Sequence, residues 1–211
     1  MRFSVILSDP PWHYNNRKTG GERCNKTKFG GGAQKHYPLM RDKDLISLAP
    51  AVQGIAADNC AHFMWATYPR LDFAMDLLKA WGFRWATVAF TWVKRNKADT
   101  SEIYGPGYYT ASNPEICLLG IRGKMRPTRK MTPSVIVCPR MEHSRKPDLH
   151  PLIEAMYPDL AGIEMFARAR REGWSAVGNE VSGFSVERDL QILAGAPPDN
   201  GGRDVREQLP L

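Results

Sequence analysis

A short apolar run that ends in two consecutive prolines is the feature that most restricts the fold of this chain. Residues 3–7 are apolar except for Ser4 and show no helical period, as is typical of a buried strand. Asp9-Pro10-Pro11 follows, and proline cannot donate to a β-ladder because it has no N–H. We therefore predict a buried first strand with a loop at its carboxyl end.

Strands and helices alternate along the rest of the chain. Leu71, Ala74, Met75, Leu78 and Trp81 have helical spacing and precede Gly82, which predicts an amphipathic helix. The other predicted helices cover residues 42–48, 147–157 and 185–194, and the other predicted strands cover 60–67, 85–93, 115–121, 134–137, 163–167 and 174–177. This alternation predicts an α/β domain with a largely parallel sheet, and such sheets bind ligands beyond the carboxyl ends of their strands.

Length and composition predict one folded domain. The chain has 211 residues, 43% of them hydrophobic, and chains usually divide only above roughly 250 residues. We expect residues 1–194 to form the domain and residues 195–211 to be a disordered tail. The four cysteines lie far apart and are expected to be reduced packing residues, with no metal site. No long apolar run or signal-peptide pattern occurs, so we expect a cytoplasmic protein without a membrane segment.

Basic residues are concentrated in two segments. Residues 122–146 contain eight basic side chains and one acidic one, and residues 13–36 contain six and one. Since the net charge of the whole chain is +7, the remainder is net acidic. Two cationic segments favour a polyanionic partner such as nucleic acid, although solvated loops without a partner would have the same composition. The candidate contacts are Arg17, Lys18, Lys28, Lys35, Arg126, Arg129 and Lys130.

The tetrapeptide Asp9-Pro10-Pro11-Trp12 is the strongest candidate for catalysis. The prolines hold their carbonyls in place as free acceptors, Asp9 adds a carboxylate, and Trp12 offers a flat stacking face. These groups suit the exocyclic amine of a base, whose lone pair could then attack a methyl sulfonium while Asp9 balances the developing positive charge. The alternative is a simple end of a strand with a packed tryptophan.

Several segments together resemble a known enzyme family. Asp9-Pro10-Pro11-Trp12, Lys146-Pro147-Asp148, residues 163–168 and Gly178-Asn179-Glu180 resemble the MT-A70-like adenine-N6 methyltransferases, which use S-adenosylmethionine. The resemblance covers about residues 3–181. Within the family, the chain resembles the compact bacterial or phage DNA enzymes. It implies a Rossmann-like methyltransferase sheet with a permuted order, in which the catalytic motif precedes the cofactor motif.

The resemblance also implies roles for individual residues. Asp9 and Pro10 would hold the target amine, Trp12 would stack on adenine, and Pro11 belongs to the same catalytic motif. Arg170 and Arg171 depart from the small polar and His residues of some members, and Tyr37 in His36-Tyr37 matches a family pattern that would contact nucleic acid. The implied cofactor contacts are Asp9, Lys146, Phe166, Arg168, Arg170, Asn179 and Glu180. A solvated Lys146, a core Phe166 and a plain polar turn at 179–180 remain the alternatives for three of these positions.

The expected activity is methyl transfer from S-adenosylmethionine to the 6-amino group of adenine in DNA, after the base is extruded from the stack. RNA is the nearest alternative substrate. A second alternative is a catalytically silent nucleic-acid-binding subunit, against which the intact Asp-Pro-Pro-Trp motif argues. Asp9 rather than Ser at the first motif position favours adenine over cytosine. The sequence leaves the recognition site and dimer formation open.

Overall fold

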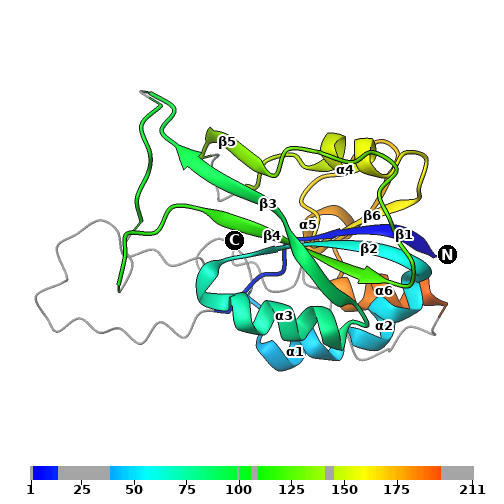
Figure 1. The fold of residues 1–211 in the computed structure, drawn as a ribbon. Coiled ribbons are helices and arrows are strands. Elements are labelled where there is room, and N and C mark those ends of the chain that lie inside the picture. Colours follow the sequence, from blue (N-terminus) through cyan, green and yellow to red (C-terminus); the bar gives the residue numbers. More distant parts are fainter. Residues whose placement is uncertain (1, 14–38, 99, 106–108, 141–144, 196–211) are drawn as a thin grey trace, which may run out of the picture.

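Seven strands form a single sheet in the computed structural model (Figure 1). The structure describes residues 2–13, 39–98, 100–105, 109–140 and 145–195. The strand order is β5-β3-β4-β2-β1-β6-β7. The strands are β1 (Phe3–Ser8), β2 (Ala56–Ala66), β3 (Arg84–Arg95), β4 (Glu115–Arg122), β5 (Val135–Pro139), β6 (Gly162–Met165) and β7 (Trp174–Val177).

Only β4 runs against the other strands of this sheet. It pairs antiparallel with both β2 and β3, whereas β1–β2, β1–β6, β3–β5 and β6–β7 are parallel. The six parallel strands therefore end at the same edge of the sheet at which β4 begins. We call this edge the carboxyl edge. The predicted α/β fold with a largely parallel sheet is confirmed.

Helices cover both faces of the sheet, and most of them lie on one side (Figure 1). One apolar cluster joins Ile6 and Met64 of the sheet to helices on that side, and a second joins Phe63 and Trp92 to Leu149 and Ile153 on the other. The first side carries α1 (Asp42–Ser47), α2 (Ala49–Ile55), α3 (Leu71–Ala80) and α6 (Val186–Ala194), and the second carries α4 (His150–Met156). Two short helices, η3 (Tyr68–Arg70) and α5 (Asn179–Ser182), complete the set.

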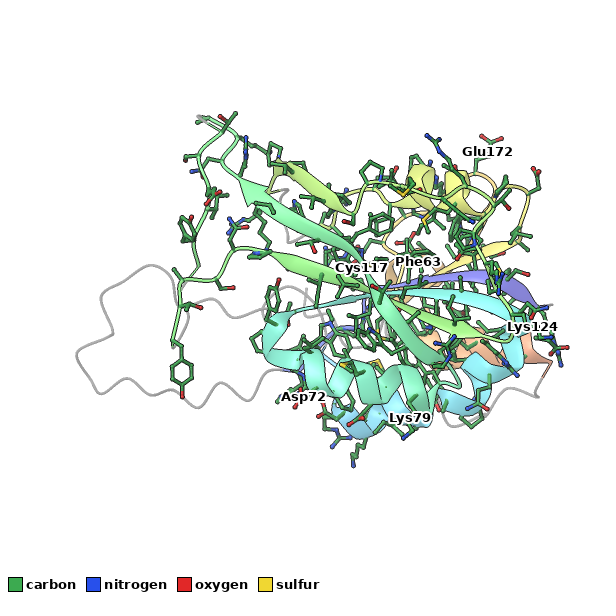
Figure 2. The ribbon with its side chains drawn as sticks, viewed as in Figure 1. Phe63, Asp72, Lys79, Cys117, Lys124 and Glu172 are labelled. Carbon is green, nitrogen blue, oxygen red and sulfur yellow. The ribbon has the colours of Figure 1, made fainter. Side chains whose placement is uncertain are left out.

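Burial explains how these helices are oriented. Ala74, Leu77 and Leu78 of α3 are buried against the sheet, whereas Asp72 and Lys79 are exposed and point outward from the same helix (Figure 2). This is the period expected for an amphipathic helix. Phe63 and Cys117, labelled in the same view, lie in the fully buried centre.

Most predicted elements are confirmed, but α2, η3 and α5 were not predicted and several elements have bounds that differ from the prediction. The helix α2 was not predicted, because its sequence contains Pro50 and Gly54; the proline lies in the first turn, where its missing N–H costs nothing. The predicted helix at 147–157 begins only at His150. The strand predicted to reach residue 167 ends at Met165, because Phe166 has a left-handed φ of 61°.

Helix ends follow the predicted signals. Gly82, with a φ of 87°, follows α3, and the Ser185 side chain accepts a hydrogen bond from the Arg188 N–H at the start of α6. The predicted tail lies outside the described residues except for Gly195. Cys60, Cys117 and Cys138 are free thiols, as predicted, whereas Cys24 lies outside the described residues. No helix in the described ranges is long and apolar enough to cross a membrane.

Candidate active site

A pocket of about 310 Å³ opens at the carboxyl edge of the sheet. Its wall comes from the end of β1, from the segment just before α4 and from the segment that follows β6. Ligand binding in this position is expected for a parallel α/β sheet. Five of the predicted cofactor contacts line it, namely Asp9, Lys146, Phe166, Arg168 and Arg170.

A chain of four alternating charges reaches this pocket through Asp9 and Lys146. Lys146 Nζ lies 3.5 Å from Asp9 Oδ1 and 2.5 Å from Glu115 Oε2, and Lys94 Nζ lies 2.6 Å from Glu115 Oε1. We call Asp9, Lys146, Glu115 and Lys94 the charge chain. Its members come from β1, the segment before α4, β4 and β3, so the sheet topology brings together residues that are distant in sequence.

The environment of the charge chain shifts the pKa of both carboxyl groups. Burial raises the pKa of Asp9; Lys146 acts against this rise, Glu115 adds to it, and Arg168 opposes it. The Asp9 side chain is 36% exposed, and it lines the pocket. Burial also acts to raise the pKa of Glu115, but Lys146 and Lys94 outweigh it, so that pKa is lowered. Glu115 is therefore ionised at neutral pH.

Two tryptophans lie beside the lysines of the charge chain. Lys94 Nζ is 5.2 Å from the centre of the Trp92 ring, and Lys146 Nζ is 6.0 Å from that of Trp65. Ammonium groups are attracted to the faces of aromatic rings at such distances. Both rings are buried, so they also limit the access of water to the ion pairs.

Lys94 and Glu115 were not predicted as site residues. Lys94 directly follows the predicted strand 85–93, and Glu115 is the first residue of the predicted strand 115–121. Polar side chains at strand ends were the signal that singled out Asp9. The same signal would have found Lys94. Glu115 additionally required knowing that β4 is antiparallel, which puts its beginning at the carboxyl edge.

The two prolines of the motif are held by main-chain hydrogen bonds. The Trp12 N–H donates to the Pro10 carbonyl oxygen over 2.9 Å, and the Met40 N–H donates to that of Pro11 over 3.0 Å. The expectation of free carbonyl acceptors is therefore wrong, because each oxygen already accepts one bond. A carbonyl oxygen has two lone pairs, so each keeps one that a substrate amine could use.

Trp12 belongs to the hydrophobic core in this structure. Its side chain is 4% exposed, and its ring packs edge-on against Phe73 with centroids 6.1 Å apart. It is absent from the described pocket wall. Stacking of Trp12 on adenine stays a prediction, and in this arrangement its ring face is covered by protein.

Asn179 and Glu180 are the first two residues of α5, and main-chain geometry holds the preceding Gly178 in place. The Ala167 N–H donates to the Val177 carbonyl oxygen, and a Cβ on Gly178 would lie 2.5 Å from the Ala167 carbonyl oxygen. Only glycine allows so close an approach of two backbones. We call residues 178–184 the glycine turn. Asn179 and Glu180 are exposed there, outside the described pocket wall, and Glu180 Oε1 is 3.4 Å from Arg168 Nε.

A carboxylate of α6 fixes the glycine turn. Asp189 Oδ2 accepts a hydrogen bond from the Ser182 hydroxyl over 2.7 Å and one from the Gly178 N–H over 3.3 Å. Ser182 in turn accepts from the Phe184 N–H. These bonds satisfy the polar groups of a half-buried turn. Asp189 was not predicted, and a lone acid in a helix gives no sequence signal for such a role.

A histidine between two carboxylates forms another part of the pocket wall. His150 Nδ1 is 2.7 Å from Asp148 Oδ1, and His150 Nε2 is 3.3 Å from Glu164 Oε2. Burial acts to lower the pKa of His150, but Glu164 and Asp148 outweigh it, so the pKa is raised. Arg171 Nη1 also contacts Asp148, at 2.7 Å. No group of three or more potential metal ligands occurs among the described residues.

The predicted nucleic-acid contacts that the structure describes lie away from the pocket. Arg126, Arg129 and Lys130 are exposed, and their segment leaves β4 at the edge opposite the carboxyl edge. The Thr128 N–H donates to the Met156 carbonyl oxygen at the end of α4, so the segment runs beside that helix (Figure 1). Arg17, Lys18, Lys28, Lys35 and Tyr37 lie outside the described residues.

Known proteins are similar to this chain in sequence. Residues 3–180 match the MT-A70 family. The Type II methyltransferase M.MunI of Mycoplasma sp is 33% identical over 203 residues, which cover 90% of this chain and 82% of M.MunI. A putative N(6)-adenosine-methyltransferase MT-A70-like protein of Medicago truncatula is 29% identical over 190 residues, which cover 88% of this chain but only 27% of the plant protein.

Proposed function

Because this chain belongs to the MT-A70 family of S-adenosylmethionine-dependent adenine-N6 methyltransferases, we propose that it methylates the 6-amino group of adenine in DNA. M.MunI, which this chain matches over 82% of its length, is named a Type II methyltransferase. This match, together with the resemblance of the motifs to compact DNA enzymes, supports DNA. The relatives named as adenosine methyltransferases make RNA the second candidate. The cytoplasm is the proposed location.

The observation that carries the proposal is the position of Asp9 in the pocket. The carboxylate lies at the carboxyl end of β1, beside an ammonium group and at the opening towards solvent. The pocket and the neighbouring Glu180 also fit the cofactor chemically. Lys146 can hold a carboxylate, Asp9 can face a positive charge, and the Glu180 carboxylate beside Arg168 can accept hydrogen bonds from ribose hydroxyls. Bound S-adenosylmethionine would supply a methyl group on a sulfonium.

The residues of the motif would orient the target amine. One Asp9 oxygen accepts a hydrogen bond from the amine, and the second lone pair of the Pro10 carbonyl can accept another. The nitrogen lone pair is then directed out of the plane of the base. Positive charge develops on this nitrogen during methyl transfer, and the Asp9 carboxylate stabilises that charge electrostatically. Because adenine stacked in a duplex cannot enter a pocket, the base must be extruded first.

A labelling experiment tests the proposal. Protein is incubated with methyl-labelled S-adenosylmethionine and separate pools of DNA and RNA, and the labelled nucleoside is identified after digestion. We expect label in N6-methyldeoxyadenosine from the DNA pool. Label confined to RNA adenosine would move the substrate to RNA, and label on cytosine would overturn the proposal. Absence of label from both pools would favour the silent subunit.

A further inference from the structure

The closest acid to Lys146 is not the motif aspartate. Lys146 Nζ lies 2.5 Å from Glu115 but 3.5 Å from Asp9. Glu115 also holds Lys94, so one carboxylate binds two ammonium groups through its two oxygens. The side chains of Lys94, Lys146 and Glu115 are 19%, 16% and 12% exposed, respectively, so these ion pairs are poorly screened by solvent.

The main chain fixes where Glu115 lies. Glu115 is the first residue of β4 and is opposite Trp92 of β3 in the ladder. Just before it, the buried Asn113 side chain accepts from the Lys94 N–H and donates to the carbonyl oxygens of Lys94 and Ile103. These bonds tie the end of β3 to the beginning of β4. The carboxylate therefore has little freedom to follow Lys146 if the lysine moves.

We propose that Glu115 is a positioning residue that holds Lys146 ready for the cofactor carboxylate and away from a close ion pair with Asp9. The Asp9 carboxylate then stays available for the target amine. A lysine that had Asp9 as its nearest acid would compete with the substrate for the same oxygen atoms. This inference rests on the proposed function, because it takes the roles of Asp9 and Lys146 from it.

The inference predicts opposite effects on the pKa of Asp9 for substitutions of Glu115 and of Lys94. The charged and titratable groups that face Asp9 come from three segments. They are Lys146 from the segment before α4, Glu115 and Cys117 from β4, and Arg168 from the segment after β6. Removing the charge of Glu115 removes an influence that raises the pKa of Asp9 and releases Lys146 towards it, so the pKa of Asp9 falls. Removing the charge of Lys94 leaves Glu115 less compensated, so the pKa of Asp9 rises.

The test compares Glu115→Gln and Lys94→Gln in the full chain. The titration of the Asp9 carboxyl carbon is followed by NMR without cofactor, and binding of S-adenosylmethionine is measured by calorimetry. We expect the Asp9 midpoint to move to lower pH in Glu115→Gln and to higher pH in Lys94→Gln. Cofactor affinity should fall roughly 10-fold in Glu115→Gln, as is usual when a charged hydrogen bond is lost. Asp58→Asn, which removes an exposed ion pair with Arg2, is the matched control and should change neither measurement.

Two outcomes overturn the inference. An unchanged Asp9 midpoint in folded Glu115→Gln would show that Glu115 does not control the site, and shifts of the same direction in both variants would indicate a general structural effect. If Glu115→Gln does not fold, Lys94→Gln decides alone, and an unchanged or lowered midpoint contradicts the inference. Failure of the proposed function is separate, because a wild-type protein that methylates no adenine could still show both opposite shifts.

Discussion

Two regions at the carboxyl edge, the pocket with its charge chain and the glycine turn beside Arg168, are held in place by different means. At the end of β1, the charge chain of Asp9, Lys146, Glu115 and Lys94 relies on ion pairs between side chains from four segments. At the end of β7, the glycine turn relies on close backbone approach at Gly178 and on hydrogen bonds to Asp189. A single charge can thus be changed in the charge chain without moving the backbone. In the glycine turn, one methyl group added at Gly178 displaces the backbone.

This difference separates residues that set the charge of the site from residues that set its shape. Side chains that must interact with a reacting amine need a tuned charge, and charge is tuned by neighbouring ions. The glycine turn, which is proposed to bind ribose, needs only a fixed shape, and the main chain supplies shape more rigidly than long side chains do. Substitutions in the charge chain and in the glycine turn should therefore change different measured quantities.

The largest expected effect is on turnover at the charge chain. Asp9→Ala should reduce turnover roughly 100-fold or more, because it removes an electrostatic contact to the transition state. The thermal unfolding temperature should change little, since the carboxylate costs free energy to bury. Label transfer to DNA measures the first quantity and circular dichroism the second. Asp72→Ala, an exposed carboxylate on the outer side of α3, should be as active as wild type (Figure 2).

A substitution in the glycine turn should act on stability instead. In Gly178→Ala the new Cβ would lie 2.5 Å from the Ala167 carbonyl oxygen, so the backbone must shift. We expect a loss of about 2 kcal/mol in the free energy of unfolding, in the range of backbone strain, together with weaker cofactor binding. Denaturant titration measures it. Gly173→Ala has a φ of 78° but meets nothing within 4 Å, so it isolates the cost of φ alone. Equal losses in both variants would contradict the close-approach argument.

Removing a side chain from the glycine turn should have a smaller effect. Glu180→Ala should weaken S-adenosylmethionine binding by about 1 kcal/mol, at the low end for a lost polar contact, because the Glu180 side chain is 46% exposed. Calorimetry measures the affinity, and the free energy of unfolding should stay near that of wild type. Unchanged affinity would place the ribose contact on another residue.

The smallest effect on the pocket is expected from the basic segment beside α4. Replacing Arg126, Arg129 and Lys130 by Ala should leave cofactor affinity unchanged, because all three lie outside the pocket wall. If they contact phosphates, the slope of log DNA affinity against log salt should flatten by roughly 2 to 3. Parallel salt titrations of the variant and wild type would show that this segment is only a solvated loop.

Sequence patterns predicted the fold more completely than the site. Strand periods and the proline stop placed Asp9 at a sheet edge, and the structure confirms that position. The role of Glu115 depends on the antiparallel direction of β4, and the apolar periodicity of a sequence does not indicate the direction of a strand. The burial of Trp12 depends on Phe73, which lies in another element, so the motif alone could not distinguish a stacking ring from a packed one.

The pairing of β1 has a consequence for how the protein is made. β1 is synthesised first, yet one of its two partners is β6, with Val5 opposite Gly162. At roughly 5 to 20 residues per second, about 10 to 30 s pass between the emergence of these two strands from the ribosome. During that interval one side of an apolar strand has no partner and is open to pairing with other chains. Nascent chains that stall before residue 162 should therefore be the ones that aggregate or need a chaperone.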